Sequence, residues 1–302
     1  RNIFPVWDWA RLPGTTAEHD RPLGRVKNGR RGTRPFVGGV SDGAFGASAM
    51  DFERDGLIAK KAWFFFDNEV VCLGAGISSS NGYRVVTSIN QCLASGPVTV
   101  KRADGSVAAL EGPERLSSPA WVHQGGFVYG ILQGGDSVGV GVSEQQGDWH
   151  RISTARKADR VTQQVFSLWL NHGKSPADAS YAYWVSAAGS AEAAAACAAT
   201  CTVRVVSNTQ QVQAAEHVRT GALQAVFYRA GSVASTAWGK VAVDSPCLLS
   251  LRRGENGVLL AVSDPSGMGK RIAVSATGVR QTVELPEGAR LGASAVCRIP
   301  GP

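Results

Sequence analysis

Apolar positions along this chain fall into many short runs, separated by clusters of glycine, proline, asparagine and aspartate. The runs are rich in β-branched and aromatic residues, which crowd on a helix and pack well on a pleated sheet. Because turn residues recur between them at regular intervals, the pattern predicts an all-β protein of antiparallel multi-sheet β-sandwiches.

The most apolar stretch, residues 62–77, predicts a β-hairpin at the centre of a large layered sheet. Residues 63–66 form its first strand, Asp67-Asn68 its turn, and residues 69–77 its second strand. The apolar residues are consecutive rather than alternating. We therefore expect both faces of these strands to be covered.

Two further segments shape the expected organisation. The N-terminal segment IFPVWDW predicts a strand, so the chain is expected to start inside a strand, as a processed product or a fragment would. The alanine-rich segment 190–200 predicts a helix capped by Ser190. We place the domain boundary there, with a large β domain over 1–195 and a smaller β-sandwich over 196–302. Other strands are expected within 83–101, 119–132, 137–143, 161–172, 181–185, 202–206, 210–214, 222–228, 239–243, 247–252, 257–263, 271–276, 280–284 and 292–298.

Size and charge narrow the function classes. With 302 residues, the chain can bury a sizeable core without disulfides or metals. No apolar run approaches the roughly 18 residues of a membrane-spanning helix. The net charge is +7 and the isoelectric point is about 9.3, which favours anionic partners such as acidic polysaccharide, nucleic acid or anionic lipid, solubility alone being the alternative.

The loop 25–34 concentrates this charge. Arginine forks match carboxylates and sulfates, so the loop is a candidate for contacting an acidic glycan, with a solvated loop as the alternative. No aromatic–basic signature or basic helix supports nucleic acid. The basic residues of the loop are Arg25, Lys27, Arg30, Arg31 and Arg34.

Several motifs point to chemistry that their surroundings do not support. The segments 39–43 and 135–139 match G-x-S-x-G, but no helical pattern follows either, as a nucleophile elbow requires. The five histidines show no metal-binding spacing. His172 is expected to be structural, and His150 beside Trp149 is expected in a surface turn rather than a cleft.

Acidic and sulfur-containing residues leave two questions open. Asp8, Glu18 and Asp20 supply oxygen ligands that Ca²⁺ prefers, although an Asp8 satisfied by turn amides is the simpler reading. Cys72 and Cys92 lie in apolar contexts and are expected to be buried thiols. The remaining cysteines are either free thiols or disulfide partners, and disulfides would indicate an oxidising compartment. The two candidate pairs are Cys197/Cys201 and Cys247/Cys297.

Ten segments, in order along essentially the whole chain, resemble polysaccharide lyase family 8, which includes chondroitin AC, hyaluronate and xanthan lyases. The run is most similar to the chondroitin AC lyase branch. The segments are NIFPVWDWARLPGTT, DRPLG, FVGGVSDGAFGAS, KKAWFFFDNEVVCLGAGI, TSINQ, GDWHRIS, LWLNHG, ASYAYWV, SNTQQVQA and AVSDP.

The resemblance implies a specific division of labour. Family members have an α/α toroid, a central β super-sandwich and a small C-terminal β-sandwich, and this chain resembles only the last two. The catalytic Asn, His, Tyr and Arg of the family lie in the toroid, so we assign no catalytic residue here. The resemblance implies a secreted or periplasmic lyase that cleaves an acidic glycan such as chondroitin or hyaluronan by β-elimination, with no required cofactor. We expect this chain alone to be inactive.

Two departures from the family pattern affect the expected sites. Where the chondroitin AC branch has a cleft aromatic after DRPL, this chain has Arg25 and Lys27 nearby. Asp8 matches a calcium ligand of some relatives, but Ala10 replaces another, so only a weak Ca²⁺ site is expected at Asp8. The alternatives to a lyase portion are a stand-alone carbohydrate-binding module and a purely structural β-sandwich.

Overall fold

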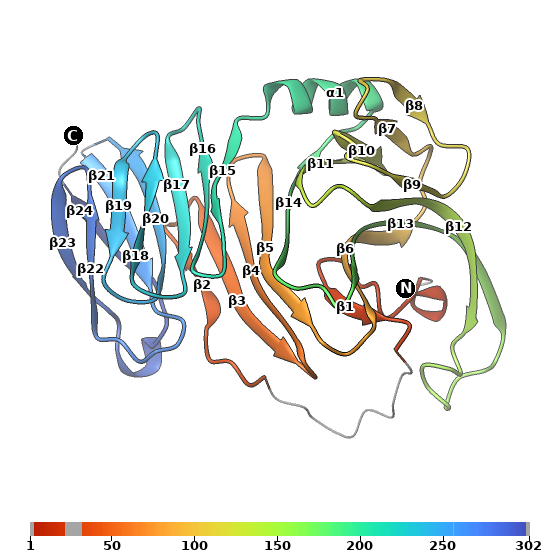
Figure 1. Ribbon diagram of the computed structural model, residues 1–302, viewed down its shortest axis with the longest axis horizontal. Coiled ribbons are helices and arrows are strands. Elements are labelled where there is room, and N and C mark those ends of the chain that lie inside the picture. Colours follow the sequence, from red (N-terminus) through yellow and green to blue (C-terminus); the bar gives the residue numbers. More distant parts are fainter. Residues whose placement is uncertain (1–2, 22–31, 256, 300–302) are drawn as a thin grey trace. The chain divides into compact units, whose positions relative to one another are not determined.

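The computed structural model describes residues 3–21, 32–255 and 257–299 (Figure 1). They fall into two compact units, one with residues 3–21, 78–181 and 185–199, the other with residues 32–77, 182–184, 200–255 and 257–299. Strands dominate, which confirms the all-β prediction, and the described residues contain one α-helix, α1 (Ala191–Thr200). Ser190 caps α1 as predicted, since its Oγ accepts the Ala193 N–H at 3.2 Å. No helix in the described part of the chain has the length and apolar character that a membrane crossing requires.

The first unit contains two antiparallel sheets. One has the strand order β1-β6-β13-β12-β9, and the other includes the neighbours β11-β10-β7-β8. Tyr129 of β11 stacks on Phe166 of β13 with ring centroids 6.4 Å apart, so the two sheets pack through their apolar faces. The strands are β1 (Thr16–His19), β6 (Arg84–Leu93), β7 (Thr99–Lys101), β8 (Val107–Ala109), β9 (Glu114–Leu116), β10 (Trp121–Gln124), β11 (Phe127–Gln133), β12 (Val138–Asp148) and β13 (Arg160–Lys174).

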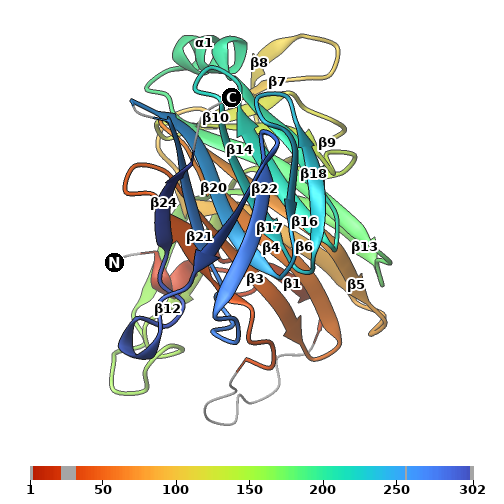
Figure 2. The ribbon, with the colours of Figure 1, turned by 90° about the vertical axis from the view of Figure 1, so that its left-hand side faces the viewer.

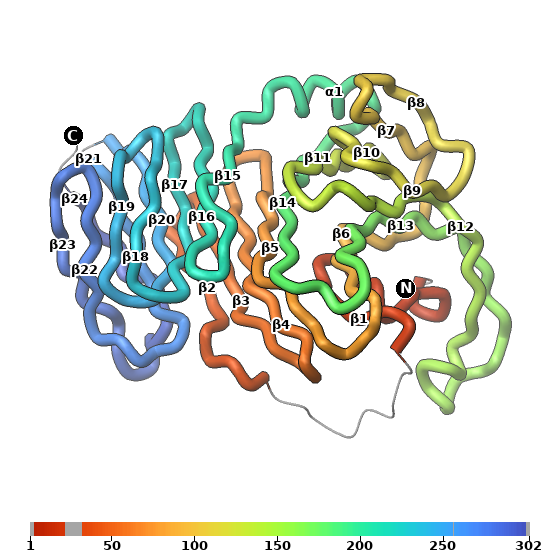
Figure 3. Tube along the Cα trace, viewed as in Figure 1, coloured from red at the N-terminus to blue at the C-terminus, as the bar shows by residue number. Residues whose placement is uncertain are grey.

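The predicted N-terminal strand is wrong. Phe4–Val6 form a 3₁₀ helix, η1, and the first strand begins only at Thr16. Pro5 lies in the first turn of η1, where its fixed φ and missing N–H are tolerated and where a strand would lose a ladder hydrogen bond. Figure 3 shows this turn beside the hairpin of β12 and β13.

Glycines in β12 allow other segments to approach its backbone closely. A Cβ at any of three positions would collide with a neighbour from a different part of the first unit. This close approach is the reason for a glycine at each position rather than a β-branched residue. The colliding pairs are Gly139 with the Trp169 ring, Gly141 with Pro113, and Gly147 with the Pro5 carbonyl of η1.

The second unit contains three groups of strands. The first group consists of the neighbouring strands β2-β3-β4-β5. The second is a six-stranded sheet with the order β15-β16-β17-β20-β21-β24, and the third is a four-stranded sheet with the order β18-β19-β22-β23 (Figure 2). Residues 78–79 of β5 belong to the first unit, and β14 (Ala179–Ala187) is divided between the units. The strands are β2 (Val37–Ser41), β3 (Gly46–Arg54), β4 (Leu57–Phe65), β5 (Glu69–Ser79), β15 (Val203–Asn208), β16 (Val212–His217), β17 (Ala222–Phe227), β18 (Gly231–Ser235), β19 (Gly239–Val243), β20 (Cys247–Gly254), β21 (Gly257–Ser263), β22 (Arg271–Ala276), β23 (Val279–Glu284) and β24 (Ala295–Ile299), with the 3₁₀ helix η2 (Gly288–Arg290) before β24.

The predicted hairpin at residues 62–77 corresponds to β4 and β5, which are neighbours in their sheet. The turn between them is closed by the Phe66 N–H, which donates to the Glu69 carbonyl at 3.0 Å. Residues 71–77 are all buried, so β5 is covered on both faces as expected. On β4, however, Phe65 is 44% exposed, so the expectation of full coverage is wrong for that strand.

The centre of the six-stranded sheet is buried on both faces, since every residue of β17 is buried, whereas the edge strands β15 and β24 are partly exposed. On one face, apolar side chains pack against the four-stranded sheet, with Trp238, Leu249 and Ile272 among them. On the other face, Gln224 donates to the Phe65 carbonyl of β4 at 3.0 Å. The Gln224 Oε1 has no hydrogen-bond partner among the described residues, so the amide is held through this one N–H bond, which joins β17 to β4.

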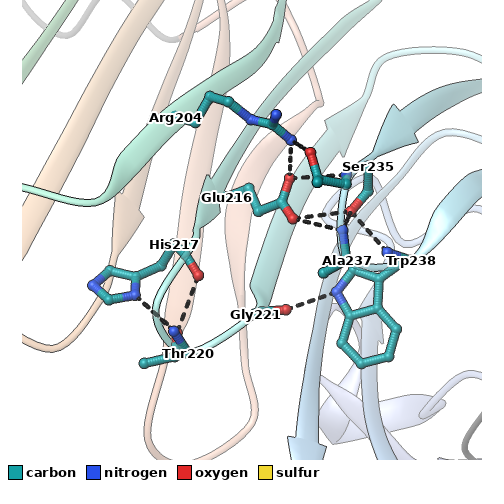
Figure 4. Close-up of polar contacts among 9 residues, drawn as sticks. Arg204, Glu216, His217, Thr220, Gly221, Ser235, Ala237 and Trp238 are labelled. Atoms are coloured by element: carbon teal, nitrogen blue, oxygen red, sulfur yellow. Dashed lines mark hydrogen bonds and ion pairs between the residues drawn. The ribbon is translucent and has the colours of Figure 1, made fainter.

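A buried carboxylate links the six-stranded and four-stranded sheets of the second unit (Figure 4). Glu216 of β16 is 1% exposed. Its carboxylate accepts hydrogen bonds from the Ala237 N–H at 2.9 Å and the Thr236 N–H at 3.2 Å, and it forms an ion pair with Arg204 at 2.5 Å. Desolvation opposes its ionisation, but the hydrogen bonds from Arg204, Ala237 and Thr236 outweigh it and lower the pKa of Glu216. Glu216 thus holds the loop after β18 against β16.

Replacing Glu216 with Gln should lower the free energy of unfolding by about 2 kcal/mol at pH 7, because charge-assisted hydrogen bonds are lost in a buried site. Because the folded pKa lies below the ordinary 4.5, this contribution is complete above pH 4.5 and is lost as the pH falls through the folded pKa. Urea titrations of parent and variant between pH 3 and pH 7 measure it. Glu284→Gln, at an exposed position of the same sandwich, is the matched control. A difference between parent and Glu216→Gln that does not shrink at acid pH contradicts the assignment.

Candidate functional site

The predicted basic loop is described only at its end. Arg25, Lys27, Arg30 and Arg31 lie outside the described residues. Arg34 forms an ion pair with Glu53 of β3, with Nε and Oε2 2.5 Å apart, and both side chains are more than one-third exposed. The role of the loop in contacting a glycan stays a prediction.

Asp8 lies in a tight turn that a single buried side chain fixes. Gln91 of β6, which is 2% exposed, accepts the Asp8 N–H at 2.8 Å and donates to the carbonyls of Asp8 and Arg11. The Asp8 carboxylate accepts the Ala10 N–H at 3.0 Å and pairs with Arg11 at 3.3 Å. A guanidinium therefore already lies where a cation would bind.

The other two acids considered as calcium ligands have separate partners. Glu18 accepts hydrogen bonds from Ser79 at 2.6 Å and Asn81 at 2.8 Å, while Asp20 pairs with Arg84 at 3.2 Å. Among the described residues, no three potential metal ligands come together. Calcium at Asp8 stays an expectation from the resemblance.

All five histidines lie in the described part of the chain, and each makes a hydrogen bond within its own unit. His172, predicted to be structural, bonds the Thr87 hydroxyl at 2.8 Å, and His150 lies exposed in a turn as expected. Burial, followed by the charge of Arg11, lowers the pKa of His19. Each imidazole thus has at least one partner within its own unit. The partners are Ala10 for His19, Ala188 for His123, Arg156 for His150, Thr87 for His172 and Thr220 for His217.

The largest pKa shift of a cation occurs at Lys61 on β4. Desolvation lowers its pKa to about 8, and burial likewise raises the pKa of the neighbouring Cys72 thiol to about 11. Such shifts often mark active sites. Here Lys61 is only 4% exposed and packs 5.4 Å from the Trp63 ring, so its ammonium is out of reach of a polymer substrate.

The two G-x-S-x-G segments and the cysteines behave structurally. Residues 39–43 run from β2 into a turn, and residues 135–139 run from a turn into β12; no helix follows either. All six cysteines are described and none forms a disulfide, including the candidate pairs Cys197/Cys201 and Cys247/Cys297. Cys72 is buried as expected, whereas Cys92 is only partly buried.

An aromatic cluster on the first unit was not anticipated from the sequence. Phe4 lies 5.1 Å from Trp7, 6.3 Å from Trp9 and 6.3 Å from Trp149, measured between ring centroids. Phe4 is 38% exposed and Trp9 is 51% exposed. The sequence shows both aromatic-rich segments, but nothing in it indicates that η1 packs on the β12–β13 hairpin, which depends on the space above Gly147.

Comparison with known proteins identifies the family to which the two β domains correspond. Residues 1–198 match the polysaccharide lyase family 8 super-sandwich domain, and residues 204–273 match the C-terminal β-sandwich domain of the same family. The chain belongs to polysaccharide lyase family 8. This confirms the resemblance seen in the sequence.

Relatives and solved structures agree with this family. Chondroitinase-AC from Pedobacter heparinus is 36% identical over 270 residues, covering 87% of this chain and 38% of the relative. Hyaluronate lyase from Thermasporomyces composti is 31% identical over 279 residues, covering 90% of this chain and 35% of the relative. A chondroitinase AC lyase structure solved with oligosaccharides has a TM-score of 0.87 and 31% identity, and covers 98% of this chain and 45% of that one. This family 8 chain therefore spans less than half the length of these relatives.

Adding a side chain at Gly147 should disturb the aromatic cluster. In Gly147→Ala, the new methyl group must displace η1, which we expect to lower the free energy of unfolding by about 1–3 kcal/mol. The near-ultraviolet circular dichroism of the tryptophans should weaken at the same time. Gly112→Ala, where a Cβ meets open space in the same unit, is the control and should leave both unchanged. A Gly147→Ala protein with parental stability and spectrum would show that η1 does not pack on β12.

Proposed function

We propose that this chain is the β-sheet portion of a secreted or periplasmic lyase that cleaves a uronic-acid-containing glycan, with the chemistry performed by an α/α toroid outside it. The observation that carries the proposal is its membership of family 8, whose relatives include chondroitin, hyaluronate and xanthan lyases. The described residues add support, because they form the strand-rich architecture of the two matched family domains.

The proposed reaction is a β-elimination. A base removes the proton from C5 of the uronic acid, the C5–H electron pair forms the C4–C5 double bond, and the bond from C4 to the glycosidic oxygen breaks. A general acid protonates that departing oxygen, and the uronate carboxylate is neutralised while charge develops. This chain would contribute one wall of the substrate cleft, and its net charge of +7 suits a polyanion.

Activity should therefore require a helical domain supplied from elsewhere. The 302-residue chain alone should produce no unsaturated uronate from chondroitin or hyaluronan, as followed by ultraviolet absorbance. Adding the toroid of Pedobacter heparinus chondroitinase-AC should increase turnover above that of the toroid alone. Turnover by this chain alone would refute the division of labour. Glycan binding that never leads to turnover with any family 8 toroid would favour a stand-alone carbohydrate-binding module.

The basic loop should contribute to glycan binding through charge. Replacing Arg25, Lys27, Arg30, Arg31 and Arg34 together with Gln should weaken binding to chondroitin sulfate by about tenfold or more and flatten its salt dependence, because exposed charges act mainly through screened attraction. Binding at several salt concentrations measures this. The control replaces five exposed basic residues of the C-terminal sandwich with Gln, namely Arg229, Lys240, Arg271, Arg280 and Arg290. Equal losses in both variants would show that only the total charge matters.

A further inference from the structure

The aromatic cluster on the first unit lies beside a strongly basic turn. The turn between β12 and β13 follows Trp149 directly, and residues 151–160 are all exposed. Hydrogen bonds from the N–H groups of Ile152 and Ser153 to the Trp149 carbonyl, at 3.1 and 2.9 Å, form a tight turn directly after Trp149. His150 Nδ1–H donates to the Arg156 carbonyl at 3.0 Å and closes the turn. We call this region, formed by Phe4, Trp7, Trp9, Trp149, Arg151, Arg156 and Lys157, the aromatic–basic surface.

Three cations of this surface lack an ion pair among the described residues. They are Arg151, Arg156 and Lys157; the Asp148 carboxylate accepts the Arg151 backbone N–H at 2.9 Å but forms no ion pair with its guanidinium. Arg11, by contrast, is paired with Asp8. Exposed cations without partners are available for an external anion at little desolvation cost. The turn therefore carries unpaired positive charge, and it begins at Trp149, whose ring contacts Phe4 of the aromatic cluster.

The surface is also held in a fixed arrangement. The space above Gly147 seats η1 on β12, Gln91 fixes the turn after Trp7, and Trp7 and Trp9 pack edge to face at 5.5 Å. Rings that are already positioned lose little conformational freedom when a ligand binds. A rigid aromatic platform with adjacent cations has the characteristics of a binding surface rather than of incidental exposure.

We propose that the aromatic–basic surface binds a segment of an acidic polysaccharide chain. The C–H face of a sugar ring carries partial positive charge and would pack on the electron-rich faces of Trp9 and Phe4. Carboxylate or sulfate groups on the neighbouring sugars would pair with Arg151, Arg156 and Lys157. The choice of a uronic-acid glycan rests on the proposed function. The surface uses none of the residues of the loop 25–34.

Direct binding by the 302-residue chain tests the proposal. Chondroitin sulfate oligosaccharides should quench or shift tryptophan emission. Trp9→Ala removes an anchor ring, and Trp149→Ala removes the ring that packs against Phe4 at 6.3 Å, so each should weaken binding by about tenfold or more. Trp9→Phe should restore most of it, because a flat ring remains. Phe127→Ala, which removes a 48% exposed ring on β11, is the matched control and should bind as the parent does.

A charge variant tests the basic part separately. Replacing Arg151, Arg156 and Lys157 with Gln should weaken binding more than replacing Lys240, Arg271 and Arg290, which are exposed elsewhere and change the net charge equally. Circular dichroism and thermal melts verify that each variant is folded.

The possible outcomes separate this proposal from the proposed function. Parental affinity in folded Trp9→Ala and Trp149→Ala overturns the proposal, as does an undetectable affinity of the parent for the glycan. Equal binding of polyglutamate or of single-stranded DNA, with equal losses in the variants, also overturns it, because a non-sugar polyanion would then be an equally good ligand. If turnover with an added toroid succeeds while the tryptophan variants bind normally, only the present proposal fails.

Discussion

A strand buried on both faces cannot release its polar side chains into water, and the second unit depends on how this constraint is met. Every residue of β17 is buried, yet Gln224 lies there with an amide that needs a partner. It finds one in the backbone of β4, while Glu216 on the next strand finds backbone and arginine partners at the β18 loop. The polar groups therefore determine the packing positions of neighbouring layers, and the apolar residues supply most of the driving force.

The first unit meets the same constraint differently. Gln91 is buried but points at a turn rather than at a strand, and its three hydrogen bonds fix the segment after η1. Glu18 is satisfied by Ser79 and Asn81 in a similar way. The acids that the sequence offers as calcium ligands thus have partners within the protein, and Gln91 and Glu18 hold loops in place.

The sequence predicts the strand-rich fold, the β4–β5 hairpin and helix α1, because each is encoded locally by turn residues, β-branched runs or alanine. It fails at residues 4–6, where Pro5 and packing on β12 outweigh the apolar pattern. It also gives no indication of β2 and β3, whose glycines and small polar residues dilute the strand signal. The family follows from ordered motifs. The aromatic–basic surface does not, because it depends on a contact between residues 4–9 and Trp149 that only the folded chain creates.

The glycines of β12 carry a consequence for how this scaffold can vary. Each of Gly139, Gly141 and Gly147 faces a different neighbour: the Trp169 ring, Pro113 and the Pro5 carbonyl. A side chain at any one of them requires a compensating change in a segment distant in the sequence. Substitution along this strand is therefore coupled to three other places at once. Protein engineers who want to redesign this scaffold would do better to leave β12 untouched and to introduce diversity in the exposed turn that follows it.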